Sequence, residues 1–145
     1  MKTSHKFRLQ KLLELKETIQ KAKQRELWLA QHKLLKRQED LQKLESSKDN
    51  FTKDMNQTEN ASVAQILRNF DYLVTLTENI LEKKQEVHQH EVEVEQKRDN
   101  LLQIKKELKM LEKLKEKILE RLQQENNNKE QKLIDELAIK KNRTI

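Results

Sequence analysis

Histidine side chains are the best candidates in this sequence for metal binding or proton transfer, because imidazole binds metals and titrates near neutral pH, and cysteine is absent. Only four histidines are present. His88 and His90 are two residues apart, and on a helix such a pair points to different faces, whereas metal ligands on one helix are spaced by three or four. The sequence also has no glycine, so it has no glycine-rich loop to hold a phosphate or dinucleotide. We expect no enzyme, no catalytic residue, no metal site and no cofactor.

A row of basic side chains recurs every four residues late in the chain. The row consists of Lys105, Lys109, Lys113, Lys117 and Arg121. An acidic row of Glu112, Glu116 and Glu120 lies three residues further on. The two rows form either a solvated helix face with salt bridges or a basic stripe that docks on an acidic partner. Nucleic-acid binding is not expected, because aromatic residues are few and acids alternate with bases.

Aromatic side chains gather in one polar part of the sequence. Phe51, Phe70 and Tyr72 flank a stretch without leucine, and they form either a hydrophobic plug or an exposed patch for a partner. Trp28 stands apart, and we expect it at the edge of the helix contact or in an interface with a partner.

The elements that must position these side chains are long helices. The 145 residues include no proline and no glycine, so the usual means of ending helices and making tight turns are missing. Charged residues make up 39% and the mean hydropathy is −1.07, values that also occur in disordered chains. Leucines at helical spacing favour helices instead.

Two helices joined by one reversal account for the pattern. We expect a helix over 4–55, a turn over 56–61 and a helix over 62–140, weakened near Asn126–Asn128. Ser62 and Gln65 have the spacing of a helix-capping box. The expected fold is all-α: one elongated domain, residues 1–145, forming a long antiparallel two-helix coiled-coil hairpin. No apolar stretch is long enough to span a membrane.

The second helix carries the clearer heptads, but their middle is polar. Lys83, His90 and Lys97 fall at core-type positions, where they either fix the register or mark a section where the helices separate. In a parallel homodimer these three side chains would meet their own copies, which favours the hairpin. The second helix is also longer than the first, so the first helix cannot bury Leu133, Ile134 and Leu137. We expect these apolar side chains to pack against another partner.

Charge is distributed unevenly along the chain. Residues 1–37 carry 11 Lys or Arg and 3 Asp or Glu, residues 38–103 carry 8 and 14, and residues 104–145 carry 12 and 8. In a hairpin this gives one basic and one acidic pole, which can steer a partner.

Three charged, leucine-rich segments stand out along the chain. They are Phe-Arg-Leu-Gln-Lys-Leu-Leu-Glu-Leu-Lys at 7–16, Met-Leu-Glu-Lys-Leu-Lys-Glu-Lys at 110–117, and Lys-Glu-Gln-Lys-Leu-Ile-Asp-Glu-Leu-Ala at 129–138. Together they resemble the flagellar export protein FliJ family. Their order and spacing match the family over the whole chain. Stalk proteins of the related injectisome secretion systems look similar.

The resemblance implies a fold similar to the central stalk of rotary ATPases. It implies a cytoplasmic protein, peripheral at the cytoplasmic side of the cell membrane. Its implied partners are the hexameric export ATPase, the cytoplasmic domain of the membrane export gate, and export chaperones. The implied ATPase contacts are Phe7, Arg8, Leu12, Leu13, Leu111, Leu114, Lys115 and Ile118. The implied gate contacts are Leu44, Phe51, Tyr72, Leu76, Asn79 and Lys83.

The hypothesis is therefore a non-enzymatic stalk and adaptor for flagellar type III protein export. The alternatives are an escort for export substrates, an injectisome stalk, a structural coiled coil that forms parallel dimers, and a basic binder of nucleic acid or membrane surfaces.

Overall fold

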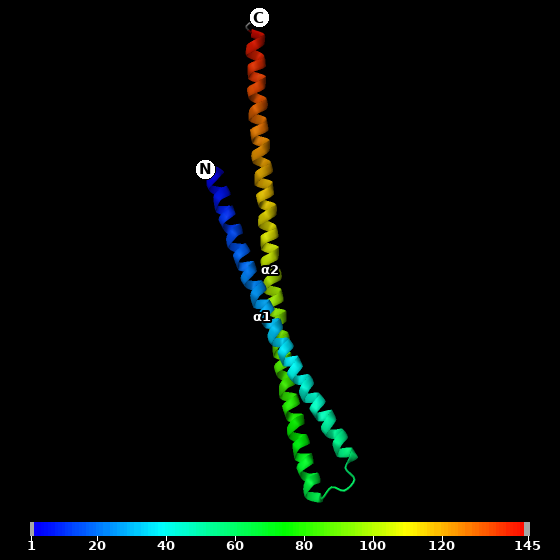
Figure 1. Ribbon diagram of the computed structural model, residues 1–145. Coiled ribbons are helices and arrows are strands. Elements are labelled where there is room, and N and C mark those ends of the chain that lie inside the picture. The colour runs from blue at the N-terminus through cyan, green and yellow to red at the C-terminus, as the bar shows by residue number, and fades with distance from the viewer. Residues whose placement is uncertain (1, 144–145) are drawn as a thin grey trace. The chain divides into compact units, whose positions relative to one another are not determined.

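Two long helices make up nearly all of the structure (Figure 1). The computed structural model describes the backbone of residues 2–143 and the side chains of residues 8–143. Helix α1 spans Lys2–Gln57 and helix α2 spans Val63–Arg143, with 56 and 81 residues. No strand occurs in residues 2–143. The predicted all-α helical hairpin is confirmed.

The reversal occupies residues 58–62, slightly later than the predicted 56–61. Helix α1 ends when the backbone N–H of Thr58 bonds to the Met55 carbonyl at 3.3 Å. At the start of α2, the Ser62 Oγ accepts a hydrogen bond from the backbone N–H of Gln65 at 3.3 Å, as an N-cap does. Residues with positive φ do not occur in the described backbone, so this reversal needs no glycine. Farther along, α2 continues without a break through Asn126–Asn128.

The helices contribute to two compact units, and the prediction of one elongated domain stays a prediction. Unit 1 comprises residues 1–21 and 102–145, and unit 2 comprises residues 22–101. Unit 2 therefore contains the reversal, and unit 1 contains both chain ends.

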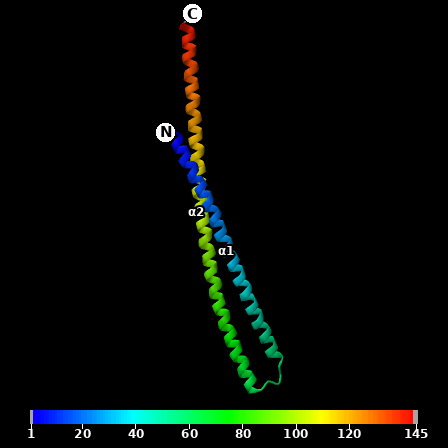
Figure 2. The ribbon, with the colours of Figure 1, turned by 60° about the vertical axis from the view of Figure 1, so that its left-hand side comes forward.

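The core of unit 2 is a narrow apolar seam where α1 and α2 run side by side (Figures 1 and 2). The helices are antiparallel, since Glu26 pairs with Lys97 while Asp40 pairs with Lys83. Spacings of three, four and seven residues place one face of α2 against α1. The buried seam residues are Ala30, Leu76, Ile80, Val87, Val94 and Leu101.

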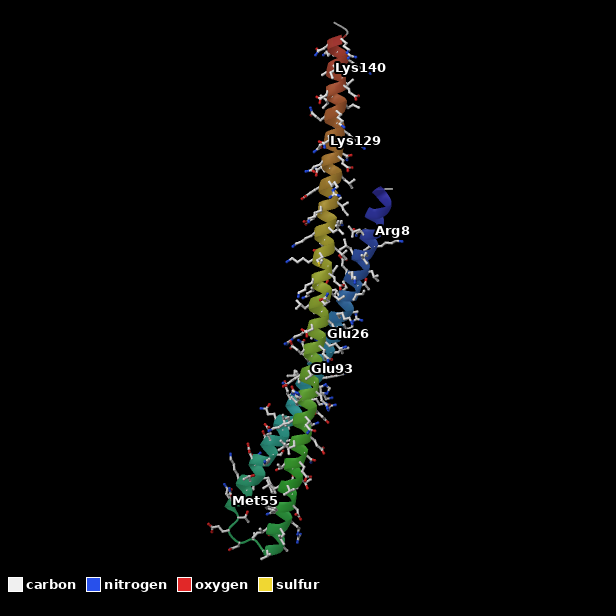
Figure 3. The ribbon with its side chains drawn as sticks, turned by 180° about the vertical axis from the view of Figure 1, so that it is seen from behind. Arg8, Glu26, Met55, Glu93, Lys129 and Lys140 are labelled. Atoms are coloured by element: carbon white, nitrogen blue, oxygen red, sulfur yellow. The ribbon has the colours of Figure 1, made fainter. Side chains whose placement is uncertain are left out.

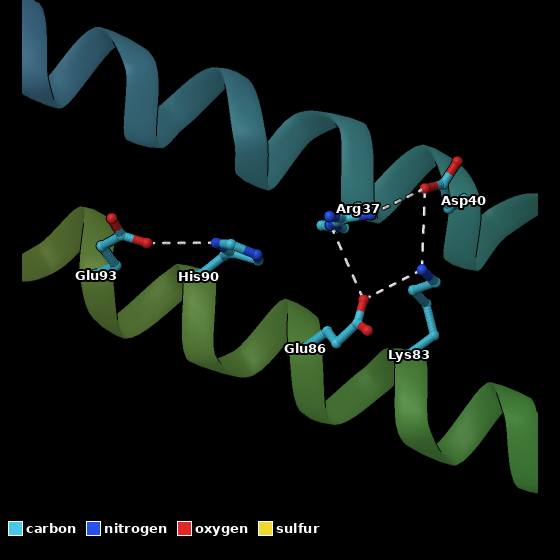
Figure 4. Close-up of polar contacts among 6 residues, drawn as sticks. All are labelled: Arg37, Asp40, Lys83, Glu86, His90 and Glu93. Carbon is cyan, nitrogen blue, oxygen red and sulfur yellow. Dashed lines mark hydrogen bonds and ion pairs between the residues drawn. The ribbon is translucent and has the colours of Figure 1, made fainter.

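Ion pairs join the helices of unit 2 at the polar core-type positions (Figure 4). The Lys83 Nζ lies 3.9 Å from the Asp40 carboxylate and 3.1 Å from Glu86, which in turn lies 3.9 Å from Arg37. Farther along, Lys97 reaches Glu26 at 3.4 Å. These contacts favour the register-setting interpretation of the polar positions over separation of the helices.

His90 behaves differently from the two lysines at the neighbouring core-type positions. Its half-buried ring lies 3.4 Å from Glu93 on its own helix (Figure 4). This contact joins residues of one helix, so it adds nothing to the pairing of α1 with α2.

The core of unit 1 is smaller. Leu13 and Leu108 are its buried apolar side chains among the described residues. Lys16 on α1 donates a hydrogen bond to Glu107 on α2 at 2.8 Å, and Lys115 donates one to Gln10 at 2.9 Å. In Figure 3, the end of α2 that carries Lys129 and Lys140 has no part of α1 beside it. Its apolar residues Leu133, Ile134 and Leu137 are each more than half exposed.

The antiparallel register is the same in both units. Residue numbers of the facing partners add up to 123 for Lys16 and Glu107, Glu26 and Lys97, and Asp40 and Lys83. The aromatic pair of Phe51 and Tyr72 follows the same rule.

Candidate partner-binding groove

An apolar groove lies on the surface of unit 1, between the first turns of α1 and the middle of α2. Its volume is about 570 Å³. Its lining residues are Leu12, Lys16, Glu107, Met110, Leu111, Lys113, Leu114 and Lys117. Residues three and four apart on a helix are neighbours, so Met110 and Leu114 form one wall, and Leu12 faces them from α1. We call this surface the unit 1 groove.

The apolar side chains that line the groove are open to solvent. Met110 is 71% exposed, Leu114 is 47% exposed and Leu12 is 40% exposed. Exposed apolar side chains that line one concave surface are typical of sites that bind another protein.

The charged residues at the rim of the groove are mainly basic. Glu107 accepts hydrogen bonds from Lys16 at 2.8 Å and from Gln103 at 3.5 Å, and these bonds hold its pKa below the ordinary value. Glu107 therefore stays ionised and is neutralised by Lys16. Lys113 and Lys117 make no ion pair within the described residues. Their charges remain available, so the groove suits an apolar element with acidic flanks.

Three of the predicted ATPase contacts line this groove: Leu12, Leu111 and Leu114. Four other predicted contacts with described side chains do not line it. Leu13 is buried in the seam, Lys115 bonds to Gln10, and Ile118 is half-buried. Arg8 is exposed, and the side chain of Phe7 lies outside the described residues.

Five lining residues were not predicted as contacts: Lys16, Glu107, Met110, Lys113 and Lys117. A signal for two of them was present, because Lys113 and Lys117 belong to the basic row at four-residue spacing. The sequence could not show that only this part of the row borders an apolar surface.

The predicted gate contacts do not form one exposed surface. Leu76 is buried in the seam of unit 2, and Lys83 is held in ion pairs. Phe51 is half-buried and packs edge-on against Tyr72, with ring centroids 4.7 Å apart. Leu44 is half-buried, while Tyr72 and Asn79 are exposed. The three aromatic side chains near the reversal therefore do not form one cluster. Phe51 and Tyr72 contact each other, whereas Phe70 is 59% exposed.

The structure also shows the surroundings of the other side chains that the sequence singled out. Trp28 stacks on His32 at 4.7 Å and is 58% exposed. His88 is exposed and lies 3.9 Å from Glu91. Among residues 8–143, no group of three or more histidine or acidic side chains is arranged to hold a metal ion. In the same described part, neither helix contains a segment apolar enough to cross a membrane.

Comparison with known families decides the identity. The family model described as the flagellar FliJ protein matches residues 5–143. The chain belongs to the FliJ family. This family is a non-enzymatic component of flagellar protein export. No curated protein and no solved structure matches the chain.

Proposed function

We propose that this FliJ family member is a non-enzymatic stalk and adaptor of the flagellar type III export apparatus. Its proposed partners are the hexameric export ATPase, the cytoplasmic domain of the export gate and export chaperones. It would act in the cytoplasm, peripheral to the cell membrane. Family membership supports a role in flagellar export, and the surfaces described above support binding to other proteins.

The unit 1 groove is the observation that best supports the proposed contact with the ATPase. It combines exposed Leu12, Met110 and Leu114 with Lys113 and Lys117, which make no ion pair among residues 8–143. We expect the ATPase to insert an apolar segment with acidic neighbours. The lysines would speed the encounter and the apolar side chains would hold the complex.

One hairpin bound to a ring of six cannot contact all six subunits equally. Binding would therefore make the subunits non-equivalent and would favour the assembled ring over free subunits, because a ligand that binds only the assembly stabilises it. The hairpin needs no catalytic residue for this role.

The test is ATP hydrolysis by the cognate export ATPase, with ring assembly followed by light scattering. The M110Q/L114Q variant removes the exposed apolar wall of the groove. We expect it to abolish most of the stimulation that the wild-type protein produces. The matched control is L102Q/L119Q, which changes two exposed leucines of unit 1 outside the groove.

Circular dichroism of each variant checks that it remains helical. Equal loss of stimulation in both variants would contradict a role for the groove. If the wild-type protein has no effect at saturation, the stalk function is wrong. Tight binding of export substrates in that case would identify an escort, while a parallel dimer by native mass would identify a structural coiled coil.

For the gate, we propose contacts in unit 2 near the reversal. Tyr72 and Asn79 are the exposed members of the predicted set. The Y72A/N79A variant should weaken binding to the cytoplasmic domain of the gate while leaving ATPase stimulation unchanged. An unchanged affinity for the gate in isothermal titration would contradict this placement.

A further inference from the structure

A second apolar stripe lies on the first turns of α2. Figure 1 shows this part of the helix directly after the reversal. The α2 stripe consists of Val63, Leu67, Phe70, Val74 and Leu81, and their exposed fractions are 75%, 61%, 59%, 43% and 57%. The stripe lies entirely in unit 2. It shares no residue with the unit 1 groove or with the predicted gate contacts.

The spacing of the stripe is that of a helix-packing surface. Successive members are four, three, four and seven residues apart, which is the heptad pattern of a coiled-coil seam. The seam that α1 covers uses different positions, among them Leu76 and Ile80. Leu81 follows the seam residue Ile80 by one residue, so the stripe lies about 100° around the helix from the seam. α2 therefore presents two packing faces, and α1 covers one of them.

One edge of the stripe is mainly acidic, with three carboxylates and one base, Arg68, which lies fourteen residues before Glu82 on the same side of the helix. Asp71 lies four residues after Leu67, Glu78 lies four after Val74, and Glu82 lies four after Glu78, so these carboxylates stand beside the stripe on one side. All three are exposed, and they make no ion pair within the described residues. Elsewhere in unit 2, Glu26, Asp40, Glu45 and Glu86 pair with bases, whereas Glu39, Asp49, Asp54 and Asp99 make no ion pair within the described residues either.

The charges oppose pairing of the stripe with a second copy. In an antiparallel pair of identical stripes, the acidic edge would lie against its own copy and the like charges would repel. In a parallel pair, the acidic edge would meet the opposite side of the stripe, where Thr77 and Lys84 continue the heptad column of Val63 and Phe70. Lys84 is already 3.9 Å from Glu45 of α1. Neither arrangement neutralises the three carboxylates.

We propose that the α2 stripe binds an amphipathic helix of another protein that carries Lys or Arg along one edge. The apolar heptad positions of that helix pack on Val63, Leu67, Phe70, Val74 and Leu81. Its basic edge lies along Asp71, Glu78 and Glu82. The inference rests on unit 2 alone and does not depend on the proposed ATPase contact.

The experiment uses two designed helical peptides of 21 residues as probes. Both carry Leu and Ile at the heptad core positions, and one has Lys while the other has Glu at the flanking positions. Binding to the full chain is measured by fluorescence anisotropy. We expect the wild-type protein to bind the basic peptide at least tenfold more tightly than the acidic one.

Two variants test which residues are responsible. The D71K/E78K/E82K variant should reverse the preference in favour of the acidic peptide. The L67Q/V74Q variant should weaken binding of the basic peptide at least tenfold. The control, E112K/E116K/E120K, changes three exposed acids of unit 1 and should keep the wild-type preference at the stripe.

Circular dichroism confirms that each variant is folded before its affinity is compared. The proposal is overturned if neither peptide binds, if both bind equally, or if the charge-reversed variant keeps the wild-type preference. It is also overturned if sedimentation shows that the chain dimerises through the stripe and that L67Q/V74Q abolishes this dimer.

Discussion

The Lys16 ammonium on α1 donates a hydrogen bond to the Glu107 carboxylate on α2 at 2.8 Å. The pair forms a wall of the unit 1 groove and joins the two helices of that unit. It is both a register contact and a border of the candidate binding surface. Its strength should therefore affect stability in a way that depends on pH.

The first prediction concerns acid stability. Hydrogen bonds from Lys16 and Gln103 lower the pKa of Glu107 below the ordinary value of 4.5. A lowered folded-state pKa contributes stability that is present above pH 4.5 and is lost as the pH falls through the folded-state pKa. The E107Q variant should therefore be less stable than the wild type at pH 7, with a smaller difference at pH 3. Thermal unfolding at both pH values measures this.

The matched control for that experiment is E120Q, which changes an exposed glutamate on the same helix. A difference between E107Q and the wild type that is the same at pH 7 and pH 3 would rule out the ionised pair as its cause.

The second prediction compares two leucines of α2. Leu76 is 6% exposed in the seam, whereas Leu67 is 61% exposed on the α2 stripe. L76A should lower the free energy of unfolding by about 2–3 kcal/mol, because it removes buried apolar groups. L67A should change it by less than about 0.5 kcal/mol. Urea unfolding measures both, and equal effects would mean that α1 does not cover the seam as described.

The third prediction concerns the polar core-type positions of unit 2. Replacing paired charges in a seam with apolar residues often raises the stability of the fold, but it lowers the specificity for one register and one oligomeric state. K83L/K97L should raise the unfolding midpoint and produce dimers at high concentration, measured by sedimentation. K33L changes an exposed lysine outside the seam and should do neither. A strictly monomeric, less stable K83L/K97L protein would show that the lysines stabilise the hairpin rather than specify it.

The fourth prediction tests the start of α2. The Ser62 Oγ caps this helix through the backbone N–H of Gln65. S62A should lower the free energy of unfolding by about 1 kcal/mol, the usual cost of losing such a cap. S47A, within α1, should be neutral or slightly stabilising, because alanine is the better helix former. If chemical denaturation gives the same value for both, the cap contributes nothing.

The fifth prediction separates the groove from the rest of the basic row. K113E/K117E should lose most of the ATPase stimulation, and the wild-type stimulation should weaken as salt rises, because salt screens exposed charges. K105E/K109E reverses two lysines of the same row that do not line the groove. Its stimulation should stay near the wild-type value, and an equal loss in both variants would indicate a general effect of charge.

Much of the fold could be predicted from local features of the sequence. A chain without glycine or proline has few ways to end a helix, and the polar stretch before Ser62 was the clearest place for a reversal. The heptads of α2 placed Lys83 and Lys97 at core-type positions, and both side chains reach acids of α1 there. Helix formation and heptad spacing depend on near neighbours, which the sequence contains directly.

The candidate site was predicted only in part. Leu12, Leu111 and Leu114 were named from a family resemblance, and they do line the groove. Leu13 and Leu76 were also named, but both are buried against the opposite helix. A leucine on a helix can serve a seam or a surface, and its type does not say which.

What the sequence determined by itself is the helical state of the chain, the place of its reversal and the membership of its family. The tertiary structure decided which acid lies near each lysine of the seam and which apolar face of α2 is covered by α1. It also decided that Leu12 and Met110 line the same groove. The physical reason is register. Helical periodicity sets the face on which a side chain lies, whereas the partner across the seam depends on how two segments far apart in the chain align.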